Sequence, residues 1–403
     1  MTERPRLLIT HPWMGRGGSE ATAMWTLEAF QDDYEITFLT ASEMNWSELN
    51  EAFGTKVDPD RITFIQAPRL PTVDGPLRLS YLQVRYFERF CRKFAPLVDC
   101  CISTYNPVQF GRPAMQLIGD FSFSEKMRKK LYIYGDDKFR HRETVFRKLY
   151  LALGKLISIP QLPLHEREDL ILANSEWVAA QLEESFQVED SPVIYPPVVL
   201  PEAPGDAIRD PLGFVCLGRI VPEKEIERII SILEMVRNNG FPITLRLIGK
   251  VEENAYGCRI RKLISDRDWI IPEGFLTLAA KQQILGSQTY ALHACRIEAF
   301  GIAVAEMASM GCIPVVPDTG GAGEIIPYPE LQFGTNEEAC RKILTLLKSP
   351  GATEKIRDEL TSRMIRFGPE VFKSELCEHL RSFTGLNKLS CHAITDQNLA
   401  ATH

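Results

Sequence analysis

Two glutamates in the stretch RIEAFGIAVAEMASMGCIPVV, Glu298 and Glu306, are separated by seven residues. We expect Glu298 in the loop after a strand and Glu306 about two turns into the following helix. Gly301 would let a ligand approach the start of that helix, where unpaired N–H groups and the helix dipole favour an anion. Carboxylates accept hydrogen bonds from hydroxyl groups, which sugar and ribose rings offer. The same spacing also fits one exposed Glu before a helix and another on its solvent face.

Two cations, Arg219 and Lys224, follow an apolar run in GFVCLGRIVPEK, where a strand should end and a helix begin. Two cations held in a dry cleft can stabilise an anionic group of a ligand without a metal ion. Solvated loop cations are the alternative. Near the amino end, Gly17 and Gly18 lack side chains, so that backbone amides there can approach a ligand. A tight turn without a ligand is the alternative for this pair.

These motifs together resemble those of the retaining glycosyltransferases of family 4, which have the GT-B fold. The resemblance covers nearly the whole chain and rests on five motifs in order: Gly17-Gly18, IYPPV at 194–198, Gly218-Arg219 with Lys224, the Glu298 to Glu306 stretch with Phe300 and Gly301, and Gly320-Gly321 before Glu324. It implies a UDP-, GDP- or ADP-sugar donor. It also implies a glycan, lipid-linked or small-molecule acceptor, transfer with retention at the anomeric carbon, and a role in glycan biosynthesis.

The resemblance also implies roles for individual residues. Glu298 would orient the donor sugar, Glu306 would hold the ribose, and Arg219 with Lys224 would stabilise the departing diphosphate. The leaving phosphate would act as the base, and no protein nucleophile is assigned. The remaining substrate-binding positions would be Gly17, Gly18, Phe300 and Gly301.

The apolar pattern of KLYIYG predicts a strand at residues 130–135. The clearest departure from the family lies here, where many members have a histidine at the end of the strand, facing the donor sugar. The matching position here is Tyr134. A phenol can donate one hydrogen bond to the sugar, but it cannot act as an imidazole does. His11 and His141 are interpreted as structural or surface histidines.

Two further functions are compatible with this fold. A GT-B epimerase or phosphorylase shares the two-domain cleft, although nothing in the chain resembles a pyridoxal lysine motif. A non-catalytic relative that only binds sugar nucleotides should have lost the charged donor residues, and all four are present. The transferase is therefore the preferred hypothesis.

Composition excludes several other classes. The chain has 403 residues and a net charge of −7, the wrong sign for a general nucleic-acid binder. Its ten cysteines and seven histidines lack the spacing of zinc or other metal sites, so we expect reduced, mostly buried thiols, no metal site and no cofactor. No segment reads as a signal peptide or membrane span, which predicts a cytoplasmic protein.

Basic residues nevertheless gather in two parts of the amino-terminal half. One group surrounds aromatic residues, and the other is a short run: Arg78, Arg85, Arg89, Arg92 and Lys93, then Lys126, Arg128, Lys129 and Lys130. Such helices could rest on anionic lipid at the inner membrane face or hold a phosphorylated acceptor. A solvated charged face over an aromatic core is the simpler interpretation.

Apolar strands alternate with helical stretches throughout the chain, which indicates α/β architecture with parallel sheets covered on both faces. Prolines crowd residues 192–211 and favour a linker there. We predict two doubly wound, Rossmann-like domains, 1–200 on the acceptor side and 201–370 on the nucleotide-sugar side. A helix at 371–384 would pack back on the first domain, and 385–403 would be a loose tail. Ligands of such sheets bind at the carboxyl ends of strands, which places the site in a central cleft.

Overall fold

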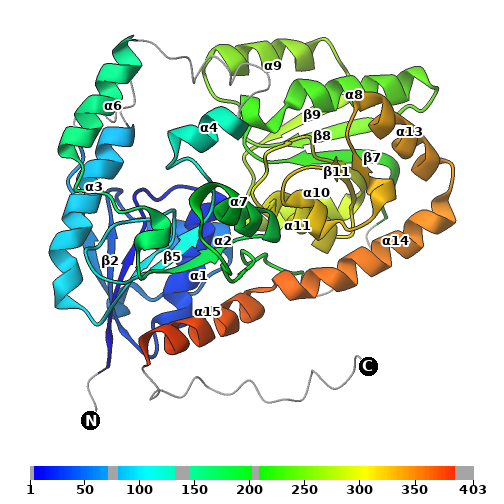
Figure 1. Ribbon diagram of the computed structural model, residues 1–403. Helices are drawn as coiled ribbons and strands as arrows, with labels where there is room; N and C mark the ends of the chain where they lie inside the picture. The colour runs from blue at the N-terminus through cyan, green and yellow to red at the C-terminus, as the bar shows by residue number, and fades with distance from the viewer. Residues whose placement is uncertain (1–3, 71–79, 132–144, 202–207, 386–403) are drawn as a thin grey trace.

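The computed structural model describes residues 4–70, 80–131, 145–201 and 208–385 (Figure 1). It contains two six-stranded sheets, one built from each half of the chain, in the orders β3-β2-β1-β4-β5-β6 and β12-β11-β10-β7-β8-β9. Every strand pairing in both sheets is parallel. The α/β fold class predicted from the sequence is confirmed.

The first sheet and its helices follow the expected alternation. The strands are β1 (Arg6–Thr10), β2 (Glu35–Thr40), β3 (Ile62–Gln66), β4 (Cys100–Ser103), β5 (Met115–Ile118) and β6 (Leu170–Ala173). The helices are α1 (Gly18–Phe30), α2 (Trp46–Phe53), α3 (Ser80–Phe94), α4 (Glu125–Leu131), α6 (Val145–Ile157) and α7 (Glu176–Phe186).

The second sheet repeats this arrangement. Its strands are β7 (Asp210–Leu217), β8 (Thr244–Ile248), β9 (Ile270–Gly274), β10 (Gln288–Leu292), β11 (Ile313–Pro317) and β12 (Gln332–Phe333). Its helices are α8 (Ile226–Asn238), α9 (Ala255–Ser265), α10 (Leu278–Ser287), α11 (Ile302–Ser309), α12 (Ala322–Ile325), α13 (Asn336–Leu347) and α14 (Pro350–Arg363), and the chain continues into α15 (Pro369–Thr384).

Both faces of the first sheet are buried, as its apolar strands require. Leu7 and Ile9 of β1 pack into a core cluster that includes Met24 of α1. The intervening Leu8 points to the other face and packs with Phe87 of α3. Successive side chains of a strand point to opposite sides, so a strand covered by helices on both sides must be apolar at every position.

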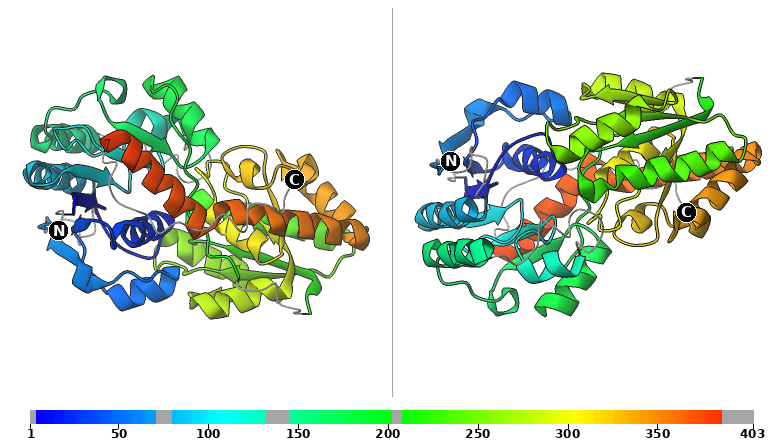
Figure 2. Two further views of the ribbon diagram at one scale, coloured as in Figure 1. Left: turned by 90° about the horizontal axis from the view of Figure 1, so that it is seen from below. Right: turned by 90° about the horizontal axis from the view of Figure 1, so that it is seen from above.

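The last helix, α15, returns to the first sheet. It runs from the second half of the molecule back alongside α1 (Figure 2). Phe372, Leu376 and Leu380 are buried in the same core cluster as Leu7. At the crossing point, the backbone N–H of Val198 donates to the carbonyl of Phe367 at 2.8 Å. The expected helix at 371–384 is present, and the domain boundaries near 200 and 370 stay predictions.

The predicted strand at residues 130–135 is wrong in its first two positions. Lys130 and Leu131 end the helix α4, whose first turn carries Glu125 and whose last turn is basic. Tyr134 and the rest of this stretch lie outside the described residues, as do His141 and the tail from 386 onward. Charged ends that suit the helix dipole favour α4 over the short apolar pattern.

Two other findings bear on the predicted class of protein. No helix within the described ranges is long and apolar enough to span a bilayer. The nine described cysteines are all free, and only Cys258 among them is exposed. The expectation of reduced, mostly buried thiols is therefore confirmed for these residues.

Candidate active site

The loop that carries Glu298 is shaped by glycines. It connects β10 with α11 and ends at Gly301, whose φ of 108° a side chain would rarely adopt. The turn after β11 packs against it so closely that a Cβ at Gly320 would lie 2.8 Å from the Glu298 carbonyl oxygen, and one at Gly321 2.1 Å from that of Ala299. The N–H of Gly321 donates to the Glu298 carbonyl at 2.8 Å. Glu298 is therefore presented by a rigid double loop at the carboxyl edge of the second sheet.

Lys224 and His293 both meet the carboxylate of Glu298. The Lys224 ammonium forms an ion pair with Glu298 Oε2, and His293 Nε2 lies 3.1 Å from the same oxygen. The side chains of Lys224 and Glu298 are 21% and 16% exposed, so this pair sits at the edge of a buried region. The arrangement places one anion between two nitrogen groups at the open end of the sheet.

The charges within this group stabilise each other. Burial by itself would raise the pKa of Glu298, but Lys224 and His293 hold that pKa well below its usual range. Burial would lower the pKa of Lys224, but the Glu298 carboxylate reverses the effect and raises it. Glu298 is thus an anion and Lys224 a cation at neutral pH.

A second ion pair fixes the loop that contains Lys224. Glu225 follows it with a φ of 49°, in the left-handed region, and is the N-cap residue of α8. The Arg296 guanidinium donates to both Glu225 oxygens, at 2.9 and 2.5 Å. Such a two-pronged contact is geometrically specific. It ties the Lys224 loop to the loop that carries Glu298.

Arg219 lies close to the ion pair of Lys224 and Glu298. It is exposed at the end of β7, and its charge opposes that of the Lys224 ammonium. The two cations expected from the sequence are therefore neighbours, one paired with Glu298 and the other facing solvent. A diphosphate would find both within one patch of positive charge.

Glu306 occupies a different position from the one expected. Because α11 begins at Ile302, Glu306 lies just past its first turn rather than two turns in. Its carboxylate accepts from Lys281 of α10 at 2.5 Å, and both side chains line a small cavity with Val199 and Leu278. The pairing leaves Glu306 about 20% exposed.

The glycine turn of the first sheet reaches the start of α11. A Cβ at Gly18 would lie 2.8 Å from Ile302 Cδ1. Gly17 is the N-cap residue of α1, and a Cβ there would meet the Glu20 carboxylate at 2.4 Å. The Gly17–Gly18 turn therefore lies against the start of α11, and its expected role in binding a ligand stays a prediction.

Helix α7 adds a second contact between the two halves. The hydroxyl of Ser175, its N-cap, donates to the Ala299 carbonyl at 2.6 Å and accepts from Val178 N–H at 3.0 Å. The Glu324 carboxylate accepts from the N–H groups of Glu176 and Trp177 at 2.9 and 2.7 Å. A carboxylate at a helix N-terminus is favourable. These bonds hold α7 against both loops of the candidate site.

Phe300 does not present its side chain to the cleft. It is 2% exposed and packs against Tyr195 and Phe367, with ring centroids 5.5 and 5.2 Å away. The side chain therefore supports the Glu298 loop from the core, and the expected role of Phe300 in substrate binding stays a prediction. Tyr134 cannot be placed because it lies outside the described residues.

Three residues that support the site were missed from the sequence: His293, Arg296 and Lys281. His293 lies five positions from Glu298, Arg296 lies 71 from Glu225, and Lys281 lies 25 from Glu306. A histidine directly after the β10 strand was the one available signal, because side chains there face the carboxyl edge of the sheet. The long-range pairs have no local signature.

His293, Cys295 and Glu298 form the one cluster of potential metal ligands among the described residues, with ligand atoms within 4.8 Å. The set does not suit a metal ion well. Burial raises the pKa of Cys295 to about 12, so the thiol keeps its proton, and Lys224 already neutralises the carboxylate. Metal ligands need to be deprotonated and available.

A buried polar group lies at the matching edge of the first sheet. His11, directly after β1, is fully buried with its ring 5.4 Å from that of Tyr105. Desolvation lowers the pKa of His11 to about 4, against the attraction of the Glu20 carboxylate. Tyr105 donates to Asp120 at 3.2 Å. The interpretation of His11 as a structural histidine is consistent with this burial, since the ring is neutral at pH 7.

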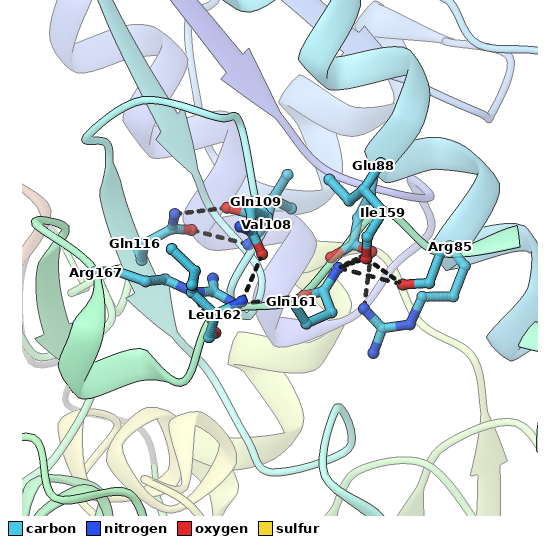
Figure 3. Close-up of polar contacts among 10 residues, drawn as sticks. Arg85, Glu88, Val108, Gln109, Gln116, Ile159, Gln161, Leu162 and Arg167 are labelled. Carbon is cyan, nitrogen blue, oxygen red and sulfur yellow. Dashed lines mark hydrogen bonds and ion pairs between the residues drawn. The ribbon is translucent and has the colours of Figure 1, made fainter. Parts of the chain in front are cut away.

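The expected basic surface on α3 is partly internal. Arg85 is 14% exposed and donates to Glu88 Oε2 at 2.8 Å, while Glu88 is itself 1% exposed. The Gln161 amide donates to the same oxygen at 3.3 Å (Figure 3). Burial raises the pKa of Glu88, although Arg85 acts in the opposite direction. The exposed cations of this helix are Arg89, Arg92 and Lys93, and Arg78 lies outside the described residues.

Residues 206–366 match the family described as Glycosyl transferases group 1. The matched segment contains Arg219, Lys224, Glu298 and Glu306. The second half of the chain is therefore similar to group 1 glycosyltransferases. No curated protein matches the sequence.

Solved structures match this segment together with the first half of the chain. Sucrose-phosphate synthase from Thermosynechococcus elongatus superposes with a TM-score of 0.70 at 15% identity, covering 95% of this chain and all of its own. The HepE protein of Anabaena, in complex with UDP and glucose, gives 0.67 at 16% identity, with 94% and 100% covered. A glycosyltransferase from Rickettsia africae gives 0.64 at 15%, with 96% and 100% covered. At this identity the likeness establishes the fold, which is GT-B.

Proposed function

We propose that the protein transfers a sugar from a nucleotide-diphosphate donor to an acceptor, with retention of configuration and without a metal ion. The observation that carries the proposal is the group of Lys224, Glu298 and His293 at the carboxyl edge of the second sheet. It lies within the segment that matches a glycosyltransferase family and opposite the Gly17–Gly18 turn.

Each residue has a task that its surroundings support. Arg219 and Lys224 meet the diphosphate, whose charge grows as the glycosidic bond breaks. Glu298 remains an anion beside the sugar, where it favours positive charge at the anomeric carbon and accepts a hydroxyl hydrogen bond. His293 positions Glu298 through the 3.1 Å contact. Glu306 binds the ribose once the ligand competes with Lys281 for its carboxylate.

The leaving phosphate removes the proton from the acceptor hydroxyl in this proposal. The new bond forms on the face from which the diphosphate departs, and configuration is therefore retained. UDP-glucose is the first donor to test, because HepE was solved with UDP and glucose and is similar in fold. The acceptor is a glycan, a lipid-linked sugar or a small molecule, and it would bind against the first sheet.

A donor panel tests the proposal. UDP-, GDP- and ADP-sugars are screened by thermal shift, because a ligand that binds only the native state raises the melting temperature. The stabilising donor is then incubated with the protein, and nucleoside diphosphate release is measured with water or candidate hydroxyl compounds as acceptors. Proton NMR of the product reports its anomeric configuration. Failure of every donor to bind, or an inverted product, would contradict the proposal.

An epimerase or phosphorylase of the same fold is the alternative from the sequence, and the match to a glycosyltransferase family does not favour it. The donor panel separates these cases. An epimerase would return a changed nucleotide sugar without releasing diphosphate, and a phosphorylase would need inorganic phosphate. A non-catalytic relative would bind the donor and leave it intact.

A further inference from the structure

The outer side of α6 exposes a continuous row of large apolar side chains. The exposed fractions are 85% for Phe146, 61% for Leu149, 44% for Leu153 and 81% for Leu156. Their spacing of three, four and three residues places them along one face of the helix. Val145, at 82%, extends the row at its start. We call these five residues the α6 stripe.

The opposite face of α6 fixes this orientation. The Tyr81 N–H of α3 donates to the hydroxyl of Tyr150 at 2.8 Å, and a Cβ at Gly154 would lie 2.1 Å from Tyr81 Cε1. Arg147 donates to Glu125 of α4 at 2.7 Å. The helix packs against α3 at the edge of the molecule (Figure 1). The stripe therefore faces away from the body of the protein.

The segment after α6 is also anchored by hydrogen bonds. Gln161 donates to the buried Glu88 of α3, and the backbone N–H of Leu162 donates to Gln109 at 3.2 Å (Figure 3). Arg167 in turn donates to the Leu162 carbonyl at 3.0 Å. With both the helix and the segment that follows it anchored, turning the stripe inward would break several polar contacts.

The charge beside the stripe is positive, although the whole chain carries −7. Helix α6 has three basic residues and no acidic one, and α4 next to it has four basic residues and one acidic. Lys148 and Lys155 are exposed and seven residues apart, so they run along one edge of the stripe. Apolar residues bordered by lysines are typical of helices that lie in the headgroup region of a bilayer.

We propose that the α6 stripe docks the protein on an anionic lipid surface. The apolar side chains enter the boundary of the acyl chains, while Lys148 and Lys155 meet lipid phosphates. A second copy of the chain fits less well, because its own stripe brings the same positive charges. The proposal does not depend on the proposed activity, since it concerns a surface of the first half of the chain.

Vesicle binding by the full chain tests this proposal in the absence of donor and acceptor. Co-sedimentation is measured with phosphatidylcholine vesicles and with an equal mixture of phosphatidylcholine and phosphatidylglycerol. We expect binding to the mixed vesicles to be about tenfold stronger and to weaken as salt is added. The double variant Leu149→Gln/Leu156→Gln should lose about tenfold in affinity.

The matched control is Leu97→Gln/Ile365→Gln, which changes two exposed apolar residues, at 60% and 64%, outside the stripe. It should bind vesicles as the parent does. Melting temperatures of both double variants check that they fold. No binding of the parent to anionic vesicles, or equal binding by the stripe variant, would overturn the proposal. So would a parent dimer in sedimentation velocity that only the stripe variant dissociates, since a second copy would then cover the stripe.

Discussion

Lowering the pH should destabilise the protein through His11. The burial of its ring gives the direction and the approximate size of the change in the free energy of unfolding. The imidazole is fully buried, and desolvation lowers its pKa to about 4 from 6.5. Between these values the unfolded chain binds a proton that the folded chain does not, so stability rises with pH. The contribution of the neutral imidazole to the free energy of unfolding is fully present above pH 6.5. It declines as the pH falls towards 4 and does not change further below that pH.

The magnitude follows from the size of the shift. One pK unit corresponds to about 1.4 kcal/mol, so the loss approaches about 3 kcal/mol below pH 4 and reaches about 2 kcal/mol at pH 5. Burial also raises the pKa of Glu88, so His11 is not the only source of pH dependence. The comparison must therefore be between the parent and a variant that lacks only the imidazole.

His11→Phe is the suitable variant, because it keeps a ring of similar size beside Tyr105 and removes the titration. Urea unfolding at pH 7 and pH 5 is followed by tryptophan fluorescence, since Trp13, Trp25, Trp46 and Trp177 all lie in the first half of the chain. The parent should lose about 2 kcal/mol more than the variant on this change of pH. His11→Gln serves as a second variant if the first does not fold. Equal pH dependence in parent and variants would refute the reasoning.

Three further predictions concern the candidate site. Glu298→Gln should lower transfer by about a hundredfold or more, because it removes an anion beside the developing sugar cation. The control variant Glu253→Gln, which changes an exposed carboxylate of the same half, should transfer as the parent does. Activity of the Glu298 variant within about threefold of the parent would exclude the role. His293→Phe should lower kcat more than it changes KM, because it misplaces Glu298 without touching the nucleotide. A change in KM alone would argue against a role of His293 in positioning Glu298. Turnover should survive EDTA, because side chains neutralise the diphosphate, and a complete loss restored by added metal would contradict this.

Much of this architecture can be predicted from the sequence, because apolar runs such as RLLIT must be buried on both sides. The strand at Ile270–Gly274 was missed, since IIPEG contains a proline and a glycine that normally interrupt strands. It lies at the edge of its sheet, where a missing N–H is tolerated. Helix α6 was not predicted as a separate helix, because a sequence alone does not distinguish exposed leucines from core leucines.

The parts of the candidate site that could be predicted are charged residues that lie near another charged residue in the sequence and close to a strand end. Glu298, Lys224 and Arg219 are of this kind. Their partners depend on tertiary structure: His293 could not be paired with Glu298, nor Arg296 with Glu225, without knowing how the loops fold against each other. The side chain of Phe300 faces the core because Tyr195 and Phe367 offer it an aromatic pocket.

The most direct test of the central claim is a calorimetric titration of UDP into the parent, Arg219→Ala and Arg341→Ala. Arg219 and Arg341 are both exposed arginines of the second half, so neither change should disturb folding. The account predicts that the parent and Arg341→Ala bind equally. Arg219→Ala should bind about 5- to 150-fold more weakly, which corresponds to about 1–3 kcal/mol for a lost charge-assisted hydrogen bond. Equal affinity in all three proteins, or no binding of UDP, GDP or ADP by the parent, would contradict the assignment of this site to a nucleotide-sugar donor.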